Sequence, residues 1–176
     1  DTGRMSDLQL SSADAPPRAT TRATIGANLP ADAAVPATTT FDPADPTSYS
    51  YTTSMTVYDS LGAAHSQSVY FVKTANPNEW QVHTYIDGTA AGPAATVQYS
   101  NMGALTSPAT GDITLPPYTP PNGAAPLAIT LNLSDSTQFG DSFNVSSITQ
   151  DGFTTGRLTS IEVSPEGVVQ ARYTNG

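Results

Sequence analysis

Residues 52–88 of this 176-residue chain, TTSMTVYDSLGAAHSQSVYFVKTANPNEWQVHTYIDG, decide its fold class. Met55, Val57 and Asp59 fall on one face of the first segment, which has the two-residue period of a β-strand. Turn-forming residues (DSLG, then NPN) separate it from two further segments of the same kind. The predicted strands are 52–58, 67–73 and 79–86. Since a sheet needs about three strands to be stable in water, the stretch predicts an antiparallel β-meander.

The rest of the chain also predicts strands rather than helices. Fifteen prolines and thirteen glycines leave few windows in which about ten helical residues could follow one another. Further strands are predicted at 8–10, 20–29, 95–99, 111–115, 127–133 and 142–148, with a terminal hairpin at 157–163 and 168–173 around turn residues 164–167. The predicted loops, rich in proline, glycine or small residues, are 31–46, 88–93 and 116–126. The predicted fold class is all-β.

The composition excludes several classes of function. Cysteine is absent, which removes disulfides, thiolate metal sites and cysteine nucleophiles. The net charge is −9, and the six basic residues, of which only Lys73 is a lysine, are scattered along the chain. Nucleic acids and anionic membranes are therefore not expected partners. No apolar run approaches the roughly 18 residues that predict a membrane-spanning helix.

The two histidines, His65 and His83, are the first candidates for a metal or proton-transfer site. No carboxylate has a ligand-like spacing beside either one, so we expect one histidine in a turn and one on a strand face. Asp42 and Asp45 lie in a DPADP segment that resembles a calcium loop only loosely, because the central glycine and terminal glutamate of such loops are missing. We expect no catalytic, cofactor-binding or metal-binding residue.

Other polar patterns also have simple structural interpretations. The acidic residues that precede or begin turns are Asp59, Asp87, Asp151 and Glu166, and turn bonding explains them better than a glycosidase pair. Glycosylation patterns begin at Asn132 and Asn144, but both lie in predicted strands and are interpreted as chance matches. The serine motif of α/β-hydrolases, G-x-S-x-G, does not occur.

Aromatic residues could form a sugar-binding platform, although such residues more often pack a core. They are Tyr70, Phe71, Trp80, Tyr85 and Tyr99. Tyr70 and Phe71 are adjacent in a predicted strand and must face opposite sides of the sheet. Some of these rings are therefore expected at a rim or an interface.

Two motifs resemble bacterial flagellar axial proteins. Residues 149–176, TQDGFTTGRLTSIEVSPEGVVQARYTNG, resemble the segment in which the chain of these proteins re-enters its middle domain. Residues 53–65, TSMTVYDSLGAAH, followed by VYFVKT at 69–74, are similar to the outer domain of the flagellar hook protein family. Rod proteins share the first motif but lack the large inserted β domain. The resemblance to the hook family covers most of the chain.

This resemblance implies two small β domains. Residues 1–41 and 148–176 would form a split middle domain, incomplete at both ends, and residues 42–147 an inserted outer domain that is a sandwich or barrel-like unit. Residues 20–29 would then pair in space with residues 157–173. Because residues 42–147 hold the meander and most aromatic residues, we expect them to fold alone.

The resemblance also implies a structural function without cofactors. The chain would be part of a subunit of the flagellar hook, the extracellular joint that transmits motor torque to the filament. Its partners would be other copies of itself in a helical tube and neighbouring axial proteins. The family's terminal helices have no counterpart here, so the chain alone is expected to be a monomer. The alternatives are an extracellular adhesin or carbohydrate-binding β-sandwich, marked by coplanar exposed aromatic rings, and a glycan-active enzyme, marked by converging carboxylates.

Overall fold

The computed structural model describes residues 15–163 and 169–174, and these residues form strands and turns without a helix. The strands are β1 (Arg22–Asn28), β2 (Tyr51–Tyr58), β3 (Ala64–Lys73), β4 (Glu79–Ile86), β5 (Thr89–Ala90), β6 (Ala95–Tyr99), β7 (Leu105–Ser107), β8 (Asp112–Thr114), β9 (Thr130–Asn132), β10 (Asn144–Gln150), β11 (Leu158–Val163) and β12 (Val169–Tyr173). The all-β fold class predicted from the sequence is confirmed.

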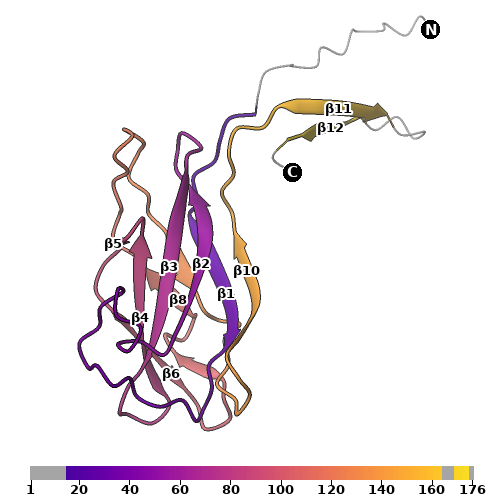
Figure 1. Cartoon of the computed structure of the whole chain (residues 1–176). Coiled ribbons are helices and arrows are strands. Elements are labelled where there is room, and N and C mark those ends of the chain that lie inside the picture. The colour runs from indigo at the N-terminus through magenta and orange to yellow at the C-terminus, as the bar shows by residue number, and fades with distance from the viewer. Residues whose placement is uncertain (1–14, 164–168, 175–176) are drawn as a thin grey trace, which may run out of the picture.

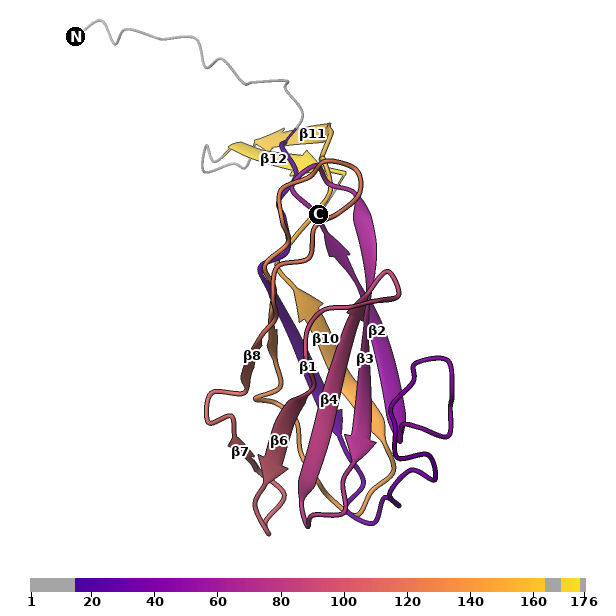
Figure 2. The ribbon, with the colours of Figure 1, turned by 90° about the vertical axis from the view of Figure 1, so that its left-hand side faces the viewer.

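Two sheets pack face to face in an elongated body (Figures 1 and 2). One has the strand order β2-β3-β4-β6-β7, with β5 paired to β4, and the other has the order β10-β1-β9-β8. The pairs are antiparallel except for β1 and β9, which run parallel. Strands β2, β3 and β4 are consecutive neighbours, so the predicted meander is confirmed.

One hydrophobic core fills the space between the sheets. The predicted face of β2 is correct, because Met55, Val57 and Asp59 are all buried. The largest fully buried apolar side chains are Trp80, Phe71, Ile25, Leu29, Ile86, Leu127, Ile129, Leu131 and Leu133. Each such side chain stabilises the fold by about 1.5–3 kcal/mol relative to an exposed one. Since these residues come from both sheets, the sheets form a single packing unit.

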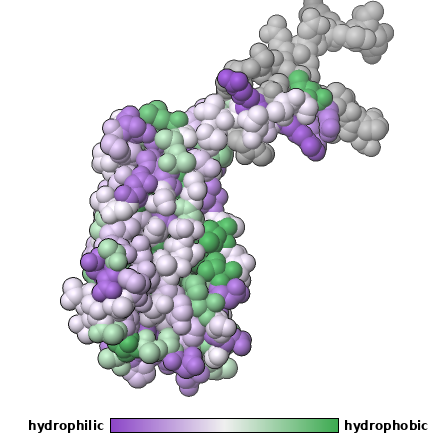
Figure 3. Space-filling view, viewed as in Figure 1, coloured by the Kyte–Doolittle hydropathy of each residue, from purple (hydrophilic) through white to green (hydrophobic). Residues whose placement is uncertain are grey.

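Strand β10 lies at the edge of its sheet and carries no charged residue. Its Ile148 pairs with the fully buried Ile25 but is itself 39% exposed. Hydrophobic colouring gathers along the side of the body where β10 lies (Figure 3). The core is therefore less completely covered along this edge than at the centre of the sheets.

Several strand boundaries differ from the prediction. Strands β5 and β7 were not predicted, since two or three residues are too few to show a period. Strand β10 begins two residues later than residue 142, and β9 occupies only part of the predicted 127–133, where Leu127 instead forms an isolated bridge with Tyr118. The predicted strand at 8–10 and the turn at 164–167 lie outside the described residues.

The predicted pairing of residues 20–29 with residues 157–173 is wrong. Strand β1 lies between β10 and β9, while β11 and β12 form a separate two-stranded sheet. Strand β1 is recruited into the body because Ala23, Ile25 and Ala27 are buried in the core between the sheets. The division into residues 1–41, 42–147 and 148–176 stays a prediction, although the strand pairing that supported it has failed.

The two ends of the body lie side by side. The backbones of Ala15 and Gly156 exchange hydrogen bonds of 2.7 and 3.1 Å, and those of Arg18 and Phe153 exchange two of 2.9 Å. Gly152 permits this approach, because a Cβ atom there would lie 2.7 Å from the backbone nitrogen of Thr20. Beyond these paired residues the β11–β12 hairpin extends away from the body (Figures 1 and 2).

Candidate functional site

The ring of His65 lies between two carboxylates. Its Nδ1 is 2.6 Å from Oδ2 of Asp87, and its Nε2 is 3.1 Å from Oδ2 of Asp59. The side chains of His65 and Asp59 are 7% and 0% exposed, whereas that of Asp87 is 39% exposed. We refer to these three residues as the histidine cluster.

Strand register brings the histidine cluster together. Asp59 directly follows β2 and continues the inward face of Val57, which is the residue paired with His65 of β3. Asp87 follows β4 in the turn with Gly88 and has a positive φ of 49°. The three side chains thus come from the end of one strand, the start of the next and the turn after β4.

Buried Asp59 also joins two loops. Its Oδ1 accepts hydrogen bonds from the amides of Leu61 (2.8 Å) and Ala63 (2.9 Å), which closes the turn between β2 and β3. Its Oδ2 accepts a 2.6 Å hydrogen bond from Nδ2 of Asn122, in the loop 116–126. A buried carboxylate without such donors would cost several kcal/mol, so these bonds stabilise its position.

The surroundings shift the acid–base behaviour of all three residues. Burial alone would raise the pKa of Asp59, but hydrogen bonds from Asn122, His65 and the turn amides lower it to about 2. Burial alone would lower the pKa of His65, but the hydrogen bonds and charges of Asp87 and Asp59 raise it above its ordinary value. Burial alone would raise the pKa of Asp87, but the hydrogen bonds from His65, Ser66 and Tyr118 and the charge of His65 together lower it. The geometry therefore favours a protonated ring between two carboxylates.

The expectation that neither histidine has a carboxylate beside it is wrong for His65. The error arose because Asp59 and Asp87 approach the ring through tertiary structure, one across a tight turn and the other from the turn after β4. His65 also lies on strand β3 rather than in the turn. Val57 and Asp59 are two residues apart and therefore share one strand face, which was the available signal in the sequence for the contact of Asp59 with His65.

His83 lies on the outer face of β4, as predicted for a strand-face histidine. Its ring stacks on Phe41 with centroids 3.8 Å apart, and burial lowers its pKa. Phe41 also contacts Tyr70 at an interplanar angle of 63°, and Tyr70 meets Tyr85 at 81°. Because these rings are strongly inclined to one another, the cluster is not a coplanar sugar-binding platform. It attaches the segment that carries Phe41 to the sheet.

The other predicted aromatic residues lie in the core. Phe71 and Trp80 are fully buried and Tyr99 is 4% exposed, with its hydroxyl 2.7 Å from Oγ of Ser136. Burial raises the pKa of Tyr99 to about 12. The prediction that Tyr70 and Phe71 face opposite sides of the sheet is confirmed, since Phe71 is buried and Tyr70 belongs to the outer aromatic cluster.

The remaining polar candidates have structural partners. Asp42 and Asp45 accept hydrogen bonds from the backbone nitrogens of Ala44 (2.9 Å) and Thr47 (2.8 Å), which are turn contacts. Asp151 accepts hydrogen bonds from the amides of residues 21 and 22 and pairs with Arg18, where the two ends of the body adjoin. Buried Asn132 donates to Oδ1 of Asp112 at 2.7 Å, whereas Asn144 is exposed on β10. Glu166 lies outside the described residues.

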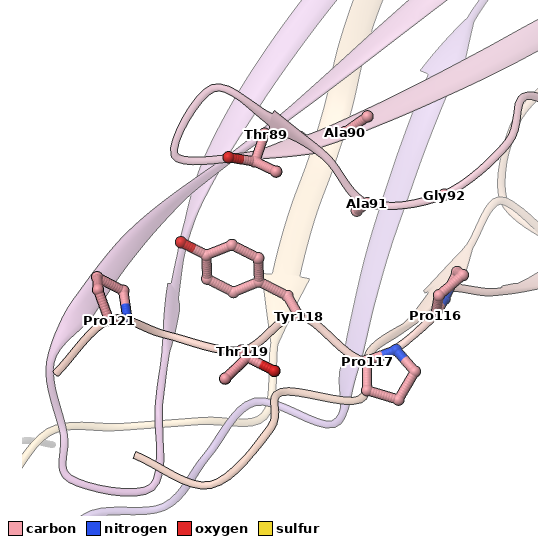
Figure 4. Close-up of a pocket in the computed structure, with 9 residues that line it drawn as sticks. All are labelled: Thr89, Ala90, Ala91, Gly92, Pro116, Pro117, Tyr118, Thr119 and Pro121. Atoms are coloured by element: carbon pink, nitrogen blue, oxygen red, sulfur yellow. The ribbon is translucent and has the colours of Figure 1, made fainter. Parts of the chain in front are cut away.

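A groove of about 600 Å³ adjoins the histidine cluster. One wall is the segment 89–92, and the other is the loop segment 116–121, which is rich in proline. Figure 4 shows the side chain of Tyr118 projecting between these walls. Its hydroxyl donates a 3.4 Å hydrogen bond to Oδ2 of Asp87, which links the groove to the histidine cluster.

Residues 15–163 and 169–174 contain no group of three or more His, Cys, Asp or Glu side chains arranged to hold a metal ion. No helix among these residues has the length and apolar character needed to cross a membrane.

A profile described as "Flagellar basal body protein FlaE D2 domain" matches residues 28–153, well over half of the chain. The chain belongs to the flagellar hook protein family. The flagellar hook protein FlgE of Salmonella typhimurium is 35% identical over 164 residues, and that of Escherichia coli is 34% identical over 168 residues. Each match covers 90% of this chain and 40% of the relative, so the chain spans 40% of the length of these hook proteins.

The hook-family fold is also found in a solved structure. The crystal structure of the Helicobacter pylori flagellar hook protein FlgE2 matches 72% of this chain and 30% of that chain, with a TM-score of 0.51 and 19% identity. At this identity the likeness concerns the fold. The resemblance to the hook family that was drawn from residues 53–65 and 149–176 is therefore confirmed.

The hook-family motif TSMTVYDSLGAAH at 53–65 now has a structural explanation. Val57 packs in the core, and Asp59 closes the turn with its carboxylate. Gly62 has a φ of +80° and lies against the paired ends of the body, where a Cβ atom on it would lie 2.8 Å from Cβ of Pro17. His65 ends the motif and connects the turn to Asp87. The motif thus fixes one end of the body.

Proposed function

We propose that the chain is the outer, β-sheet part of a structural subunit of the flagellar hook. The hook is the extracellular joint that transmits motor torque to the filament, and the partners of the subunit are other copies of itself and neighbouring axial proteins. Membership of the hook family over residues 28–153 supports this assignment. The function is mechanical, and it needs no catalytic group.

The observation that carries the proposal is that the two ends of the body lie side by side. Residues 15–18 and 153–156 pair side by side at one end of the body. A domain whose ends adjoin can be inserted into another domain without disturbing the path of the host chain. The relatives are much longer than this chain, which supports an inserted domain within a longer subunit.

We retain two domains in this proposal but move their boundaries. The inserted outer domain comprises residues 15–156, because β1 and β10 share its core. The hairpin β11–β12 belongs to the middle domain, together with chain beyond the 176 residues. An isolated two-stranded hairpin is at best marginally stable in water, so it needs further strands or helices as packing partners.

The surface of the body suits contacts that exchange during rotation. Charged residues make up only 12% of the chain, about half of the usual proportion. Contacts between small, polar and weakly charged faces are individually weak. The chain alone is therefore expected to remain a monomer at micromolar concentration, which sedimentation would measure.

Labelling in the bacterium tests the proposal. An epitope inserted after Gly140, an exposed position around which the structure leaves open space, should not disturb the core. In cells that express the tagged full-length protein as their only copy, gold-labelled antibody should mark the hook and the cells should swim. Labelling confined to the filament or the cell body would contradict the assignment.

A further inference from the structure

The number of protons on His65 determines how many of its contacts are hydrogen bonds. A neutral imidazole has one N–H, whereas the protonated ring has two. Both ring nitrogens of His65 are within hydrogen-bond distance of a carboxylate oxygen, at 2.6 Å for Asp87 and 3.1 Å for Asp59. Only the protonated ring donates to both. When the ring loses a proton, one carboxylate faces a nitrogen lone pair instead.

The two carboxylates respond differently to that loss. Asp59 is fully buried and held by Leu61, Ala63 and Asn122, so it cannot move away from the ring. Asp87 is 39% exposed and can turn toward water. The neutral ring therefore keeps its single N–H on Asp59, and its other nitrogen repels Asp87. Asp87 is the contact that is released.

Release of Asp87 changes contacts of the groove walls. Its Oδ1 accepts a 2.9 Å hydrogen bond from the amide of Ser66, and its Oδ2 accepts one from the hydroxyl of Tyr118. Tyr118 belongs to the proline-rich wall, and Asp87 begins the turn that leads into the other wall, residues 89–92. Asp87 is thus joined to one wall of the groove by the hydrogen bond from Tyr118 and to the other wall through the chain.

We propose that His65 is a proton-operated switch that holds the groove walls together when it is protonated and releases Asp87 and Tyr118 when it is not. The groups that face the ring are Asp59 from the turn after β2, Asp87 from the turn after β4 and Tyr118 from the loop 116–126. The switch depends on contacts within the body and is independent of the assignment to the hook.

The direction of the pH dependence follows from the geometry. Because the two carboxylates raise the pKa of His65, the folded protein holds this proton more tightly than the unfolded chain does. The stabilisation is complete below the ordinary imidazole value of about 6.5 and is lost as the pH rises through the raised pKa. The groove walls therefore separate as the pH rises through the raised pKa of His65.

Histidine titration by NMR tests the switch on the unmodified chain. The chain has two histidines, so His83 serves as an internal control. We expect His65 to titrate above about 6.5 and His83 below it. The amide signal of Ser66 and the ring signals of Tyr118 should shift in the same step as His65. A His65 titration at or below the ordinary value, or one that leaves Ser66 and Tyr118 unchanged, would overturn the proposal.

Two matched variants identify the cause of the shift. Asp87→Asn should lower the pKa of His65, because the hydrogen bond and the charge of a nearby carboxylate are lost. Asp141→Asn removes the same charge from an exposed site before β10 and should leave the titration unchanged. Tyr118→Phe keeps both carboxylates, so the pKa of His65 should stay raised. The signals of the loop 116–126 should no longer shift in the same step as His65. Equal effects of Asp87→Asn and Asp141→Asn would contradict a local switch.

Discussion

Trp80 donates a hydrogen bond from its indole Nε1 to the side-chain oxygen of Gln138, which lies 58 residues further along the chain and 2.8 Å away. Gln138 in turn donates from Nε2 to Oδ1 of Asn78, also at 2.8 Å. Trp80 is fully buried in β4, and Gln138 lies in the segment between β9 and β10. The pair therefore fixes that segment against the opposite sheet.

Replacing Gln138 should expose the importance of this bond. Gln138→Leu leaves the buried indole N–H of Trp80 without its acceptor, so the free energy of unfolding should fall by about 1–3 kcal/mol. Urea denaturation followed by tryptophan fluorescence measures the change. Gln170→Leu, at an exposed glutamine of β12, should change the stability by no more than about 0.5 kcal/mol. Similar losses in both variants would contradict a specific role for the bond.

Gln67 should be replaceable with a gain in stability. It is fully buried, and neither its amide nitrogen nor its oxygen has a hydrogen-bond partner among the residues that the structure describes. Gln67→Met has a similar length and no such polar groups, so the free energy of unfolding should rise by about 1 kcal/mol. The matched change Gln81→Met, at an exposed position of the neighbouring strand, should be nearly neutral. A marked loss of stability in Gln67→Met would show that the amide is satisfied in solution.

Asp59 should make the stability of the body sensitive to acid. Its pKa falls from 3.8 to about 2 on folding, which corresponds to about 2 kcal/mol of stabilisation for this fully buried group. A lowered pKa stabilises above the unfolded value of 3.8, and the effect is lost as the pH falls toward 2. Asp59→Asn should therefore be less stable than the original chain at pH 6 and approach it near pH 2. A stability difference that does not change over this range would contradict the assignment.

Residues 42–147 should not fold alone, contrary to the expectation from the sequence. This segment lacks β1 and cuts β10, so the fully buried Ile25 and its neighbours would be missing from the core. A polypeptide of residues 15–156 retains both strands and the paired ends. Calorimetry should show a cooperative transition for residues 15–156 and none for residues 42–147. A cooperative transition in the shorter segment would restore the original boundary.

The sequence alone determined which segments form the main strands. Burial alternates with a period of two along β2, β3, β4 and β6, so each of these segments carries the signal by itself. Turn residues separate these segments for local steric reasons. The hook-family resemblance was likewise contained in the local strings at 53–65 and 149–176. Strands β5 and β7 are too short for any period to be visible.

Only the tertiary structure decided which strands pair and which charges meet. A strand with an apolar face, such as β1, can pair with any strand whose sheet covers a core. Its sequence pattern therefore does not distinguish pairing with β10 from pairing with β12. The pairing depends on how Ile25 fills the space between two sheets formed by residues distant in sequence. The two carboxylates around His65 come from different turns, so their proximity depends on strand register in three dimensions. Period and turn chemistry are local properties, whereas packing and electrostatic contacts depend on the whole fold.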